Sequence, residues 1–600
     1  MSFVVGRVSR TNLLQRRIGL AALLGVAPLA ISAAPSGGPA TATADASRCA
    51  GVSAMMAGHW PDATTRVTSA QWRAKGYAVA QATQPDRPPV MLTLPAHCEV
   101  SGLMRPHRGV DGQDYAIRFR LRLPSTWNGR FLFTGGGGTN GTVGDAIGTL
   151  QAGTPDALTR GYAVLAQDSG HDNATNSDPA HGGAVAFGRD PVARADYGGT
   201  SLPQVTLAAK ALLAQFYGRG PRYSYFMGCS KGGQEGMVLA QRYPALFDGI
   251  VAAAPGFALP RAALAEAWNV QAFAGVLRAV GRPVTVPALA STFLPAQGAR
   301  VRQAILAACD ADDGLADGII GAPGRCTNAR VLPQLDAALC RPGEDAGQCL
   351  VPAQIDALRK VHDGLRGADG RTIYPGFPWD AGWFDPGWAI WMTGSADGHV
   401  PSLNVMLGAG SRAGVFTTPP AAVPATPDAL LAYQLAFDPA RDAGAILRRA
   451  APFTRSAWQD IGARSTDMSA FRRHGGRLIV PHGMSDPVFS VADTLAWWNG
   501  VDRANGGRAA SFARVFPVPG MAHCAGGPAT DHTDAFDALV AWVERGRAPD
   551  QLAGRAGPAS PWPGRERPVC RYPLALQATT RDGQTVFACR PEGGLPQRAR

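Results

Sequence analysis

Ser230 lies within residues 228–232, Gly-Cys-Ser-Lys-Gly, which match the pattern Gly-x-Ser-x-Gly. An apolar run at 223–227 precedes this pattern, and a helix-like segment at 234–243 follows it. A strand, a sharp glycine turn and a helix are the setting of a nucleophile elbow, in which the turn exposes a serine hydroxyl above a sheet. In a chain with 73 glycines the pattern alone is weak. Ser230 is therefore interpreted as a nucleophile only together with its partners.

A serine nucleophile needs a base to take its proton, and the base needs an acid to orient it. In α/β-hydrolases the three residues follow the chain order Ser, Asp or Glu, His. Asp486 and His523 follow Ser230 in this order, and each comes just after a predicted strand, where side chains gather at the carboxyl edge of a sheet. Taken singly, Asp486 could be a turn residue before a proline, and His523 a polar loop histidine. Jointly they predict a catalytic triad.

The carbonyl oxygen that gains charge during nucleophilic attack needs preorganised N–H donors. The N–H of Lys231, directly after the nucleophile, is one predicted donor. The glycine run 135–138 is placed to supply the other, and Gly136 is the residue we predict within it. The alternatives for this run are a flexible turn or a phosphate-binding loop. No Gly-Lys-Ser or Gly-Lys-Thr follows it, which excludes a P-loop.

The elements that position these residues alternate between strands and helices. Strands are predicted at 115–123, 130–134, 161–167, 223–227, 249–254, 477–480 and 513–518, and helices at 205–217, 234–243 and 534–545. This alternation predicts an α/β-hydrolase fold, with a mostly parallel sheet covered on both faces. Residues 257–472 depart from it, with helical stretches, prolines, tryptophans and four cysteines, and are predicted to form a large inserted, mainly helical lid domain. The core is thereby divided into 45–256 and 473–600.

Residues 1–44 have the features of a secretory signal and leader. Four arginines precede an apolar stretch at 18–34, and small-residue cleavage candidates follow it at 40–44. A membrane anchor is the alternative, but a span needs about 20 apolar residues and this stretch is shorter and contains Pro28. We predict a secreted or periplasmic protein without stable membrane insertion after signal cleavage.

The formal net charge of +12 falls to 12 − 4 = +8 without the four arginines of the leader. The remaining basic residues are almost all arginines, scattered without a Lys/Arg-rich block. This distribution is typical of a solvated surface, so no nucleic-acid partner is predicted. Nothing in the sequence indicates an oligomeric state.

Ten cysteines in a chain with an export signal indicate five disulfides. None lies in a Cys-x-x-Cys pattern, which disfavours a zinc site. Several form near pairs that are easy to close, but spacing alone leaves the connectivity open.

A dense acidic cluster occupies residues 309–319, Cys-Asp-Ala-Asp-Asp-Gly-Leu-Ala-Asp-Gly-Ile. Carboxylates interspersed with glycines suit a hard cation such as Ca²⁺. The cluster is not an EF-hand, because Gly314 falls on the third ligand position and Gly321 stands where the closing glutamate would be. A solvated acidic turn is the alternative.

Cys229-Ser230, Asp486 and His523-Cys524 together resemble the CS-D-HC arrangement of the tannase/feruloyl esterase family, which includes the bacterial hydrolase of mono(2-hydroxyethyl) terephthalate. The resemblance extends from about residue 49 and includes the Gly-Gly-Gly-Gly-Thr-Asn-Gly loop and Asp-Ser-Gly-His. It implies five disulfides, namely Cys49–Cys98, Cys229–Cys524, Cys309–Cys326, Cys340–Cys349 and Cys570–Cys589. It also implies a structural calcium ion in the lid, held by the side chains of Asp310, Asp313 and Asp317 and the carbonyls of Leu315 and Ile319.

The resemblance implies fewer substrate contacts. Phe489 resembles an aromatic residue that packs on the substrate ring, while Arg412 and Phe416 are candidates for the acyl pocket. Arg412 could bind a substrate carboxylate with two parallel hydrogen bonds, or be an ordinary surface arginine. Lys231 occupies a position that is often acidic in the family.

We predict a secreted serine carboxylic-ester hydrolase whose small-molecule substrates are esters of aromatic acids, either hydroxycinnamic or gallic. Hydrolysis of terephthalate monoesters is the alternative within this class. A lid-bearing binding protein without activity is the alternative outside it, and a serine peptidase would use the same triad.

Overall fold

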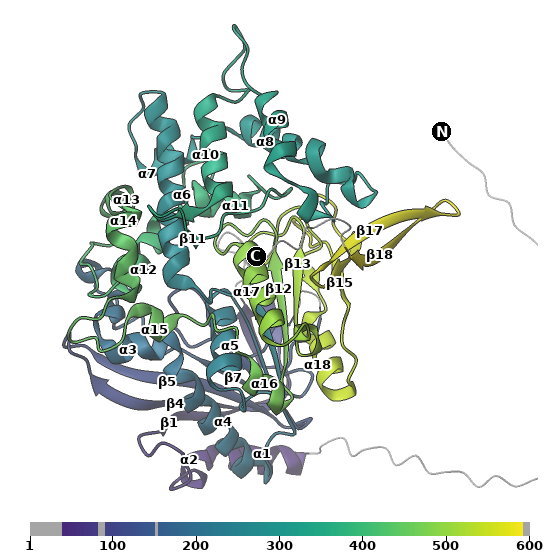
Figure 1. The fold of residues 1–600 in the computed structure, drawn as a ribbon. Helices are drawn as coiled ribbons and strands as arrows, with labels where there is room; N and C mark the ends of the chain where they lie inside the picture. Colours follow the sequence, from purple (N-terminus) through teal and green to yellow (C-terminus); the bar gives the residue numbers. More distant parts are fainter. Residues whose placement is uncertain (1–38, 82–89, 151–153, 592–600) are drawn as a thin grey trace, which may run out of the picture. The chain divides into compact units, whose positions relative to one another are not determined.

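The computed structural model describes residues 39–81, 90–150 and 154–591. The described residues from Asp45 onward form one compact unit (Figure 1). The predicted signal and leader lie outside the described residues, apart from the positions that begin helix α1 (Pro39–Ala50).

A nine-stranded sheet forms the centre of this unit, with the strand order β1-β4-β5-β7-β6-β8-β9-β12-β13. Its strands are β1 (Arg66–Arg73), β4 (His97–Arg108), β5 (Asp114–Pro124), β6 (Arg130–Thr134), β7 (Ala163–Gln167), β8 (Tyr223–Cys229), β9 (Gly249–Ala253), β12 (Arg477–Gly483) and β13 (Ala513–Val518). All seven predicted strands are confirmed.

The sheet is mixed but mostly parallel, as predicted, because five of its eight strand pairs are parallel. From β7 through β6, β8, β9 and β12 to β13 every pair is parallel, whereas β1–β4, β4–β5 and β5–β7 are antiparallel. Residues 109–113 alone join β4 to β5, and so short a connection permits only antiparallel pairing. The residues expected to do chemistry all follow strands of the parallel part.

Helices cover both faces of the sheet because its strands are apolar on both sides. In β12, Leu478 and Val480 belong to one hydrophobic cluster and Ile479 to another. Helix α18 packs into the second cluster, and the other three main flanking helices pack into the first. These helices are α4 (Ser201–Tyr217), α5 (Lys231–Arg242), α17 (Val491–Ala504) and α18 (Ala535–Arg545). The predicted helices at 205–217, 234–243 and 534–545 are thereby confirmed.

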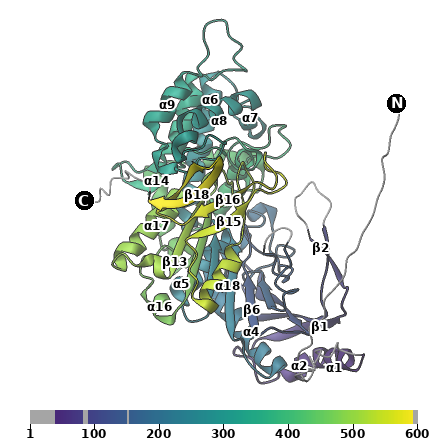
Figure 2. The ribbon, with the colours of Figure 1, turned by 90° about the vertical axis from the view of Figure 1, so that its right-hand side faces the viewer.

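Residues 259–474, called the helical segment below, connect β9 to β12. They contain α6 (Leu259–Ala279), α7 (Val286–Ala290), α8 (Pro295–Cys309), α9 (Asn328–Asp336), α10 (Pro352–Asp363), α11 (Pro386–Met392), α12 (Ala409–Gly414), α13 (Pro427–Leu435), α14 (Pro439–Asp442), α15 (Ala457–Ile461) and α16 (Ser469–His474), with the hairpin β10 (Leu365–Arg366) and β11 (Thr372–Tyr374). Many of these helices gather above the ends of β12 and β13 (Figures 1 and 2). They bury their own hydrophobic cluster, which includes Trp379, Trp383 and Trp388.

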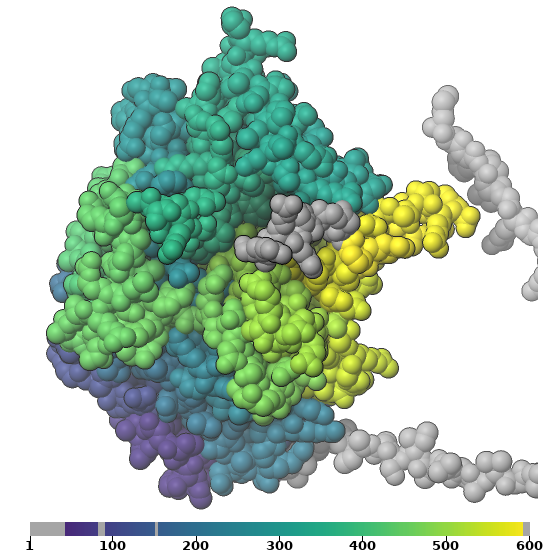
Figure 3. Space-filling model, viewed as in Figure 1, coloured from purple at the N-terminus to yellow at the C-terminus, as the bar shows by residue number. Residues whose placement is uncertain are grey.

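Smaller elements complete the unit. They are α2 (Val52–Met55), β2 (Ala78–Gln81), β3 (Val90–Thr93), α3 (Pro191–Ala195), β14 (His532–Thr533), β15 (Gln551–Arg555), β16 (Glu566–Cys570), β17 (Leu574–Arg581) and β18 (Gln584–Pro591). The hairpin β17–β18 projects from the surface in the space-filling view (Figure 3). None of the helices in the described ranges is long and apolar enough to cross a membrane.

All five disulfides implied by the family resemblance are present. They are Cys49–Cys98, Cys229–Cys524, Cys309–Cys326, Cys340–Cys349 and Cys570–Cys589. Cys229–Cys524 closes the longest stretch of chain, with a sequence separation of 295. This bond connects the end of β8 to the loop that follows β13, two segments that lie far apart along the sequence.

Candidate active site

Ser230 occupies the turn between β8 and α5, with φ 64° and ψ −118°. This left-handed conformation is strained for a serine and marks a sharp strand-to-helix turn. The flanking glycines leave space for it. A Cβ on Gly228 would lie 2.6 Å from the backbone of Gly232, and a Cβ on Gly232 would lie 2.8 Å from the carbonyl oxygen of Gly136. Only glycine at both positions lets the turn close beside the glycine run.

The loops that follow β12 and β13 bring Asp486 and His523 together. The His523 Nδ1 atom lies 2.8 Å from Asp486 Oδ2, and the carboxylate is buried. The other ring nitrogen of His523, Nε2, is buried and has no hydrogen-bond partner among the described residues. This arrangement leaves Nε2 available to a group in the adjacent cavity.

Asp486 is held by further polar contacts. The backbone N–H groups of Val488 and Phe489 donate to its Oδ1 at 2.8 and 3.0 Å. His482 Nε2 lies 3.3 Å from its Oδ2. Burial acts to raise the pKa of Asp486, but the charges and hydrogen bonds of His523 and His482 outweigh it and hold this pKa well below its ordinary value. Asp486 is therefore ionised at neutral pH and can orient an imidazole.

A cavity of about 250 Å³ lies where these loops meet the helical segment. Ser230 and His523 both line it. The rings of Phe489 and Trp391 lie edge-on to the His523 imidazole, with centroid distances of 5.3 and 5.6 Å. Phe416 adds a third aromatic wall. The cavity is thus largely apolar, with a serine and an imidazole among the groups that line it.

The disulfide Cys229–Cys524 ties the two loops of this site together. Cys229 directly precedes Ser230, and Cys524 directly follows His523. Their Cα atoms are 6.0 Å apart. Because both ends of the bond adjoin the predicted nucleophile and base, it restricts how far the two side chains can separate.

Gly136 does not have the free N–H that its predicted role as an oxyanion donor requires. Its N–H donates to Glu235 Oε2 at 3.0 Å and is therefore engaged within the protein. Gly138, two residues later, lines the cavity. Among the described residues, no hydrogen-bond acceptor receives the N–H of Gly137 or Gly138. The sequence did not indicate that a glutamate on α5 would engage this particular N–H.

The Lys231 side chain forms a buried ion pair with the same glutamate. Lys231 Nζ lies 3.0 Å from Glu235 Oε1 and 4.5 Å from the centre of the Tyr197 ring. Burial lowers the pKa of Lys231, while the charge of Glu235 acts in the opposite direction. Glu235 also accepts hydrogen bonds from Asn140 and Ser169. It therefore links the elbow to the glycine run.

Two of the three predicted substrate residues, Phe416 and Phe489, line the cavity, but Arg412 does not. The guanidinium of Arg412 donates to the carbonyl of Tyr433 at 2.8 Å and to Gln434 Oε1 at 3.2 Å, and it lies 3.8 Å from the Tyr433 ring centre. Acceptors and an aromatic ring on α13 hold the Arg412 side chain. These contacts account for its absence from the cavity in which it was predicted to lie.

Sequence reasoning missed several residues that line the cavity, among them Tyr197, Glu266 and Trp391. Trp391 and Glu266 belong to α11 and α6 of the helical segment. The tryptophans of this segment were a visible signal, but three of the six are buried core residues. Their spacing does not distinguish core positions from cavity positions.

The acidic cluster lies next to the C-terminal strands. Arg567 Nη2 lies 2.6 Å from Asp317 Oδ2. The pKa of Asp313 is raised to about 6, first by burial and then by Asp317 and Asp310. The N–H groups of Leu315 and Ile319 donate to Asp313 and Asp317. Across the described ranges, no three Asp, Glu, His or Cys side chains are grouped closely enough to hold a metal ion.

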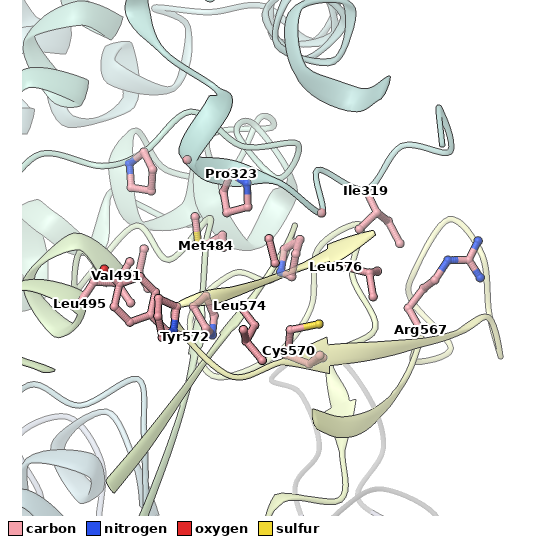
Figure 4. A pocket seen from close by; sticks show the side chains of 18 of the residues that line it. Ile319, Pro323, Met484, Val491, Leu495, Arg567, Cys570, Tyr572, Leu574 and Leu576 are labelled. Atoms are coloured by element: carbon pink, nitrogen blue, oxygen red, sulfur yellow. The ribbon is translucent and has the colours of Figure 1, made fainter. Parts of the chain in front are cut away.

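A second cavity, of about 300 Å³, adjoins this cluster. Figure 4 shows it between Ile319 and Pro323 on one side and Tyr572, Leu574 and Leu576 on the other. None of the three predicted catalytic residues lines it. Its walls join the acidic loop to the disulfide-bonded C-terminal strands.

The parallel strands, with a serine elbow at their carboxyl edge, define an α/β-hydrolase-like protein. The chain belongs to the tannase and feruloyl esterase family, whose model matches residues 98–586. It is 43% identical over 551 residues to the mono(2-hydroxyethyl) terephthalate hydrolase of Piscinibacter sakaiensis, covering 88% of this chain and 89% of that protein. It is 28% identical over 490 residues to the probable feruloyl esterase B-1 of Aspergillus flavus, covering 76% of this chain and 80% of that one.

Two solved structures share the fold. Feruloyl esterase B from Aspergillus oryzae superposes with a TM-score of 0.69 at 24% identity, covering 91% of this chain and 100% of that one. Tannin acyl hydrolase from Aspergillus niger gives a TM-score of 0.61 at 20% identity, covering 90% and 95%. Family membership and these relatives identify the chain as a carboxylic ester hydrolase with a small-molecule ester as substrate.

Proposed function

We propose that this chain is an exported serine esterase for esters of aromatic acids, hydroxycinnamic or gallic, with Ser230, His523 and Asp486 as its catalytic triad. The cavity carries this proposal, because Ser230, the His523 ring and aromatic side chains all line one cavity. Aromatic side chains favour a flat ring packed against them.

Ser230 Oγ attacks the ester carbonyl carbon while His523 Nε2 takes its proton. Asp486 keeps the proton of His523 on Nδ1 and stabilises the imidazolium that forms, for which the 2.8 Å contact is suitable. His523 then protonates the departing alcohol, leaving an acyl group on Ser230. A water molecule, activated by the same imidazole, attacks the acyl carbon and releases the aromatic acid.

The tetrahedral intermediate carries a negative oxygen that needs two N–H donors. The N–H of Lys231 is one of them. We assign the second to Gly137 or Gly138 rather than to Gly136, whose N–H is bound to Glu235. The Glu235 carboxylate thereby acts as a positioning group for the glycine run.

Hydrolysis of terephthalate monoesters is the second candidate, favoured by the 43% identical relative that carries this activity in its name. A panel of methyl ferulate, methyl gallate, methyl p-coumarate and mono(2-hydroxyethyl) terephthalate separates the two. We expect the phenolic esters to give the higher kcat/KM. A higher value for the terephthalate monoester would establish the second candidate instead.

The remaining proposals concern the setting of the enzyme. The helical segment acts as a lid that supplies most of the substrate walls, and the predicted signal directs the chain to the periplasm or the medium. Each proposal has a direct readout: substitutions in the lid should change substrate preference, and the mature N-terminus should lie near residues 40–44.

Calcium is proposed as a structural ion held by Asp310, Asp313 and Asp317 with the carbonyls of Leu315 and Ile319. Binding would have to draw the three carboxylates closer together than they lie in the described residues. The oxygen donors and the raised pKa of Asp313 suit a cation, although Arg567 already neutralises Asp317. A bound ion would join the acidic loop more firmly to the C-terminal strands. Chelation with EGTA should then lower the Tm by several degrees, and Ca²⁺ but not Mg²⁺ should restore it. An unchanged Tm, with no metal in the purified protein, would remove calcium from the proposal.

A further inference from the structure

Glu266 lies on α6 with its carboxyl group in the wall of the active-site cavity. The side chain is only 6% exposed. It also lies directly against Gly408, since a Cβ on that glycine would come within 2.1 Å of Glu266 Oε2. Glycine at position 408 therefore leaves room for the carboxyl group, and both residues line the same cavity.

No donor in the described residues forms a hydrogen bond or ion pair with this carboxyl group. Arg412, whose charge acts on Glu266, directs its guanidinium to Tyr433 and Gln434 instead. Burial raises the pKa of Glu266 to about 8, and the more distant charge of Arg412 lowers it only in part. A polar group buried without a partner is costly, so a ligand that supplies one is stabilised.

The charges around the cavity restrict what that ligand can be. Lys231 is the lysine that lines the cavity, and its side chain is already paired with Glu235. No arginine lines the cavity. A substrate carboxylate would be buried here beside Glu266 without a free cation, and an unpaired buried ion is unfavourable. A phenolic hydroxyl is neutral and can both donate to and accept from a carboxyl group.

We propose that Glu266 is a specificity-determining residue that hydrogen-bonds a hydroxyl group on the aromatic ring of the substrate and disfavours a ring that carries a carboxylate. This inference rests on the proposed function, because it assumes that the aromatic acyl group occupies the cavity beside Ser230. The inference names a residue in the cavity wall that would select esters of hydroxylated acids over terephthalate monoesters.

Two substrate pairs test the proposal in the full-length enzyme. Methyl p-coumarate and methyl cinnamate differ by one ring hydroxyl, and monomethyl terephthalate and methyl benzoate differ by one carboxylate. We expect kcat/KM to favour the hydroxylated ester by about tenfold, the worth of one well-made buried hydrogen bond. We expect the carboxylate to lower kcat/KM relative to methyl benzoate. A hydroxyl ratio near one in the wild type, or a preference for monomethyl terephthalate, overturns the proposal.

Two variants then assign the preference to Glu266. Glu266→Gln retains hydrogen-bonding capacity and should keep the hydroxyl ratio within about threefold, whereas Glu266→Leu has a similar volume and should bring the ratio close to one. Hydrolysis of ethyl acetate and the Tm report whether each variant is folded. If the role of Glu266 were purely structural, its substitution would change the Tm and leave the hydroxyl ratio unchanged. That result would contradict the proposal.

The failure of the proposed function is distinguishable from the failure of this inference. If the wild type hydrolyses ethyl acetate but none of the four aromatic esters, the assumed substrate class is wrong and the role of Glu266 falls with it. If the aromatic esters are hydrolysed and Glu266→Leu, with an unchanged Tm, retains the wild-type hydroxyl ratio, only the inference about Glu266 is wrong.

Discussion

The sheet edge and the helical segment contribute to the cavity in different ways. The sheet edge, meaning the ends of β8, β12 and β13, carries Ser230, Asp486 and His523 on loops held by backbone hydrogen bonds and one disulfide. The helical segment contributes side chains such as Trp391 and Glu266 from separate helices. The chemistry therefore depends on a few tightly determined positions, whereas the substrate walls depend on how helices pack.

This difference predicts different costs of mutation. On the proposed mechanism, a substitution at the sheet edge removes a reacting group, while one in the helical segment changes the fit of the substrate ring. The first should lower the rate for all esters, and the second should change which ester is preferred.

The largest expected effect is that of Ser230→Ala compared with Trp391→Ala. We expect Ser230→Ala to lower kcat/KM for methyl ferulate by about 10⁴-fold or more, because no nucleophile remains. Trp391→Ala should cost about tenfold, mainly through KM, because one wall of the cavity is lost. Circular dichroism and Tm should show both variants folded. Similar losses in the two variants, or an active Ser230→Ala, would contradict the division between chemistry and fit.

The disulfides allow the sheet edge and the helical segment to be compared in their contributions to stability. Replacing Cys229 and Cys524 by serine should cost about 5 kcal/mol of unfolding free energy, since this bond closes a long stretch of chain. The matched control is Cys340–Cys349 in the helical segment, which spans a sequence separation of 9 and should cost about 3 kcal/mol. Urea unfolding measures both.

Activity distinguishes the two pairs further. Loss of Cys229–Cys524 should lower kcat at temperatures where the protein remains folded, because the loops of Ser230 and His523 are no longer tied together. Loss of Cys340–Cys349 should leave kcat unchanged. An unaffected kcat in the first variant would mean that the strand ends alone position the triad.

The sequence predicted the sheet edge better than the helical segment. Strands alternating with helices, and motifs just after strands, place side chains at one edge of a parallel sheet whatever the details of packing. The positions of Ser230, Asp486 and His523 follow from this rule. The antiparallel pairing of β1, β4 and β5 does not follow from this rule. The direction of pairing depends on the length of the connections rather than on strand composition.

The cavity walls could not be predicted in the same way. Trp391 and Trp388 lie on one short helix, yet only Trp391 lines the cavity while Trp388 belongs to the core. Arg412 was predicted to line the acyl pocket from the family resemblance, but it contacts acceptors on α13 and does not line the cavity. Such outcomes depend on tertiary contacts between helices distant in sequence, which residue type and spacing do not encode.

One buried carboxyl group joins the two regions. Asp380, in the helical segment, accepts hydrogen bonds from Ser485 Oγ at 2.6 Å and from the N–H of Gly520 at 2.7 Å. These two residues lie in the loops that follow β12 and β13. Burial raises the pKa of Asp380 from 3.8 to about 6, against the lowering effect of these bonds.

The smallest expected effect is the pH dependence that Asp380 produces. Because its pKa is higher in the folded protein, the folded state binds more protons than the unfolded state between pH 4 and 6, so its contribution to stability falls as pH rises through this window. Asn at this position does not titrate. The free energy of unfolding of the wild type relative to Asp380→Asn should therefore fall by about 1–3 kcal/mol from pH 4 to pH 6 and change little above pH 7. A difference that is constant with pH would show that Asp380 is already ionised, and that the helical segment meets the sheet edge through a charged group rather than a neutral one.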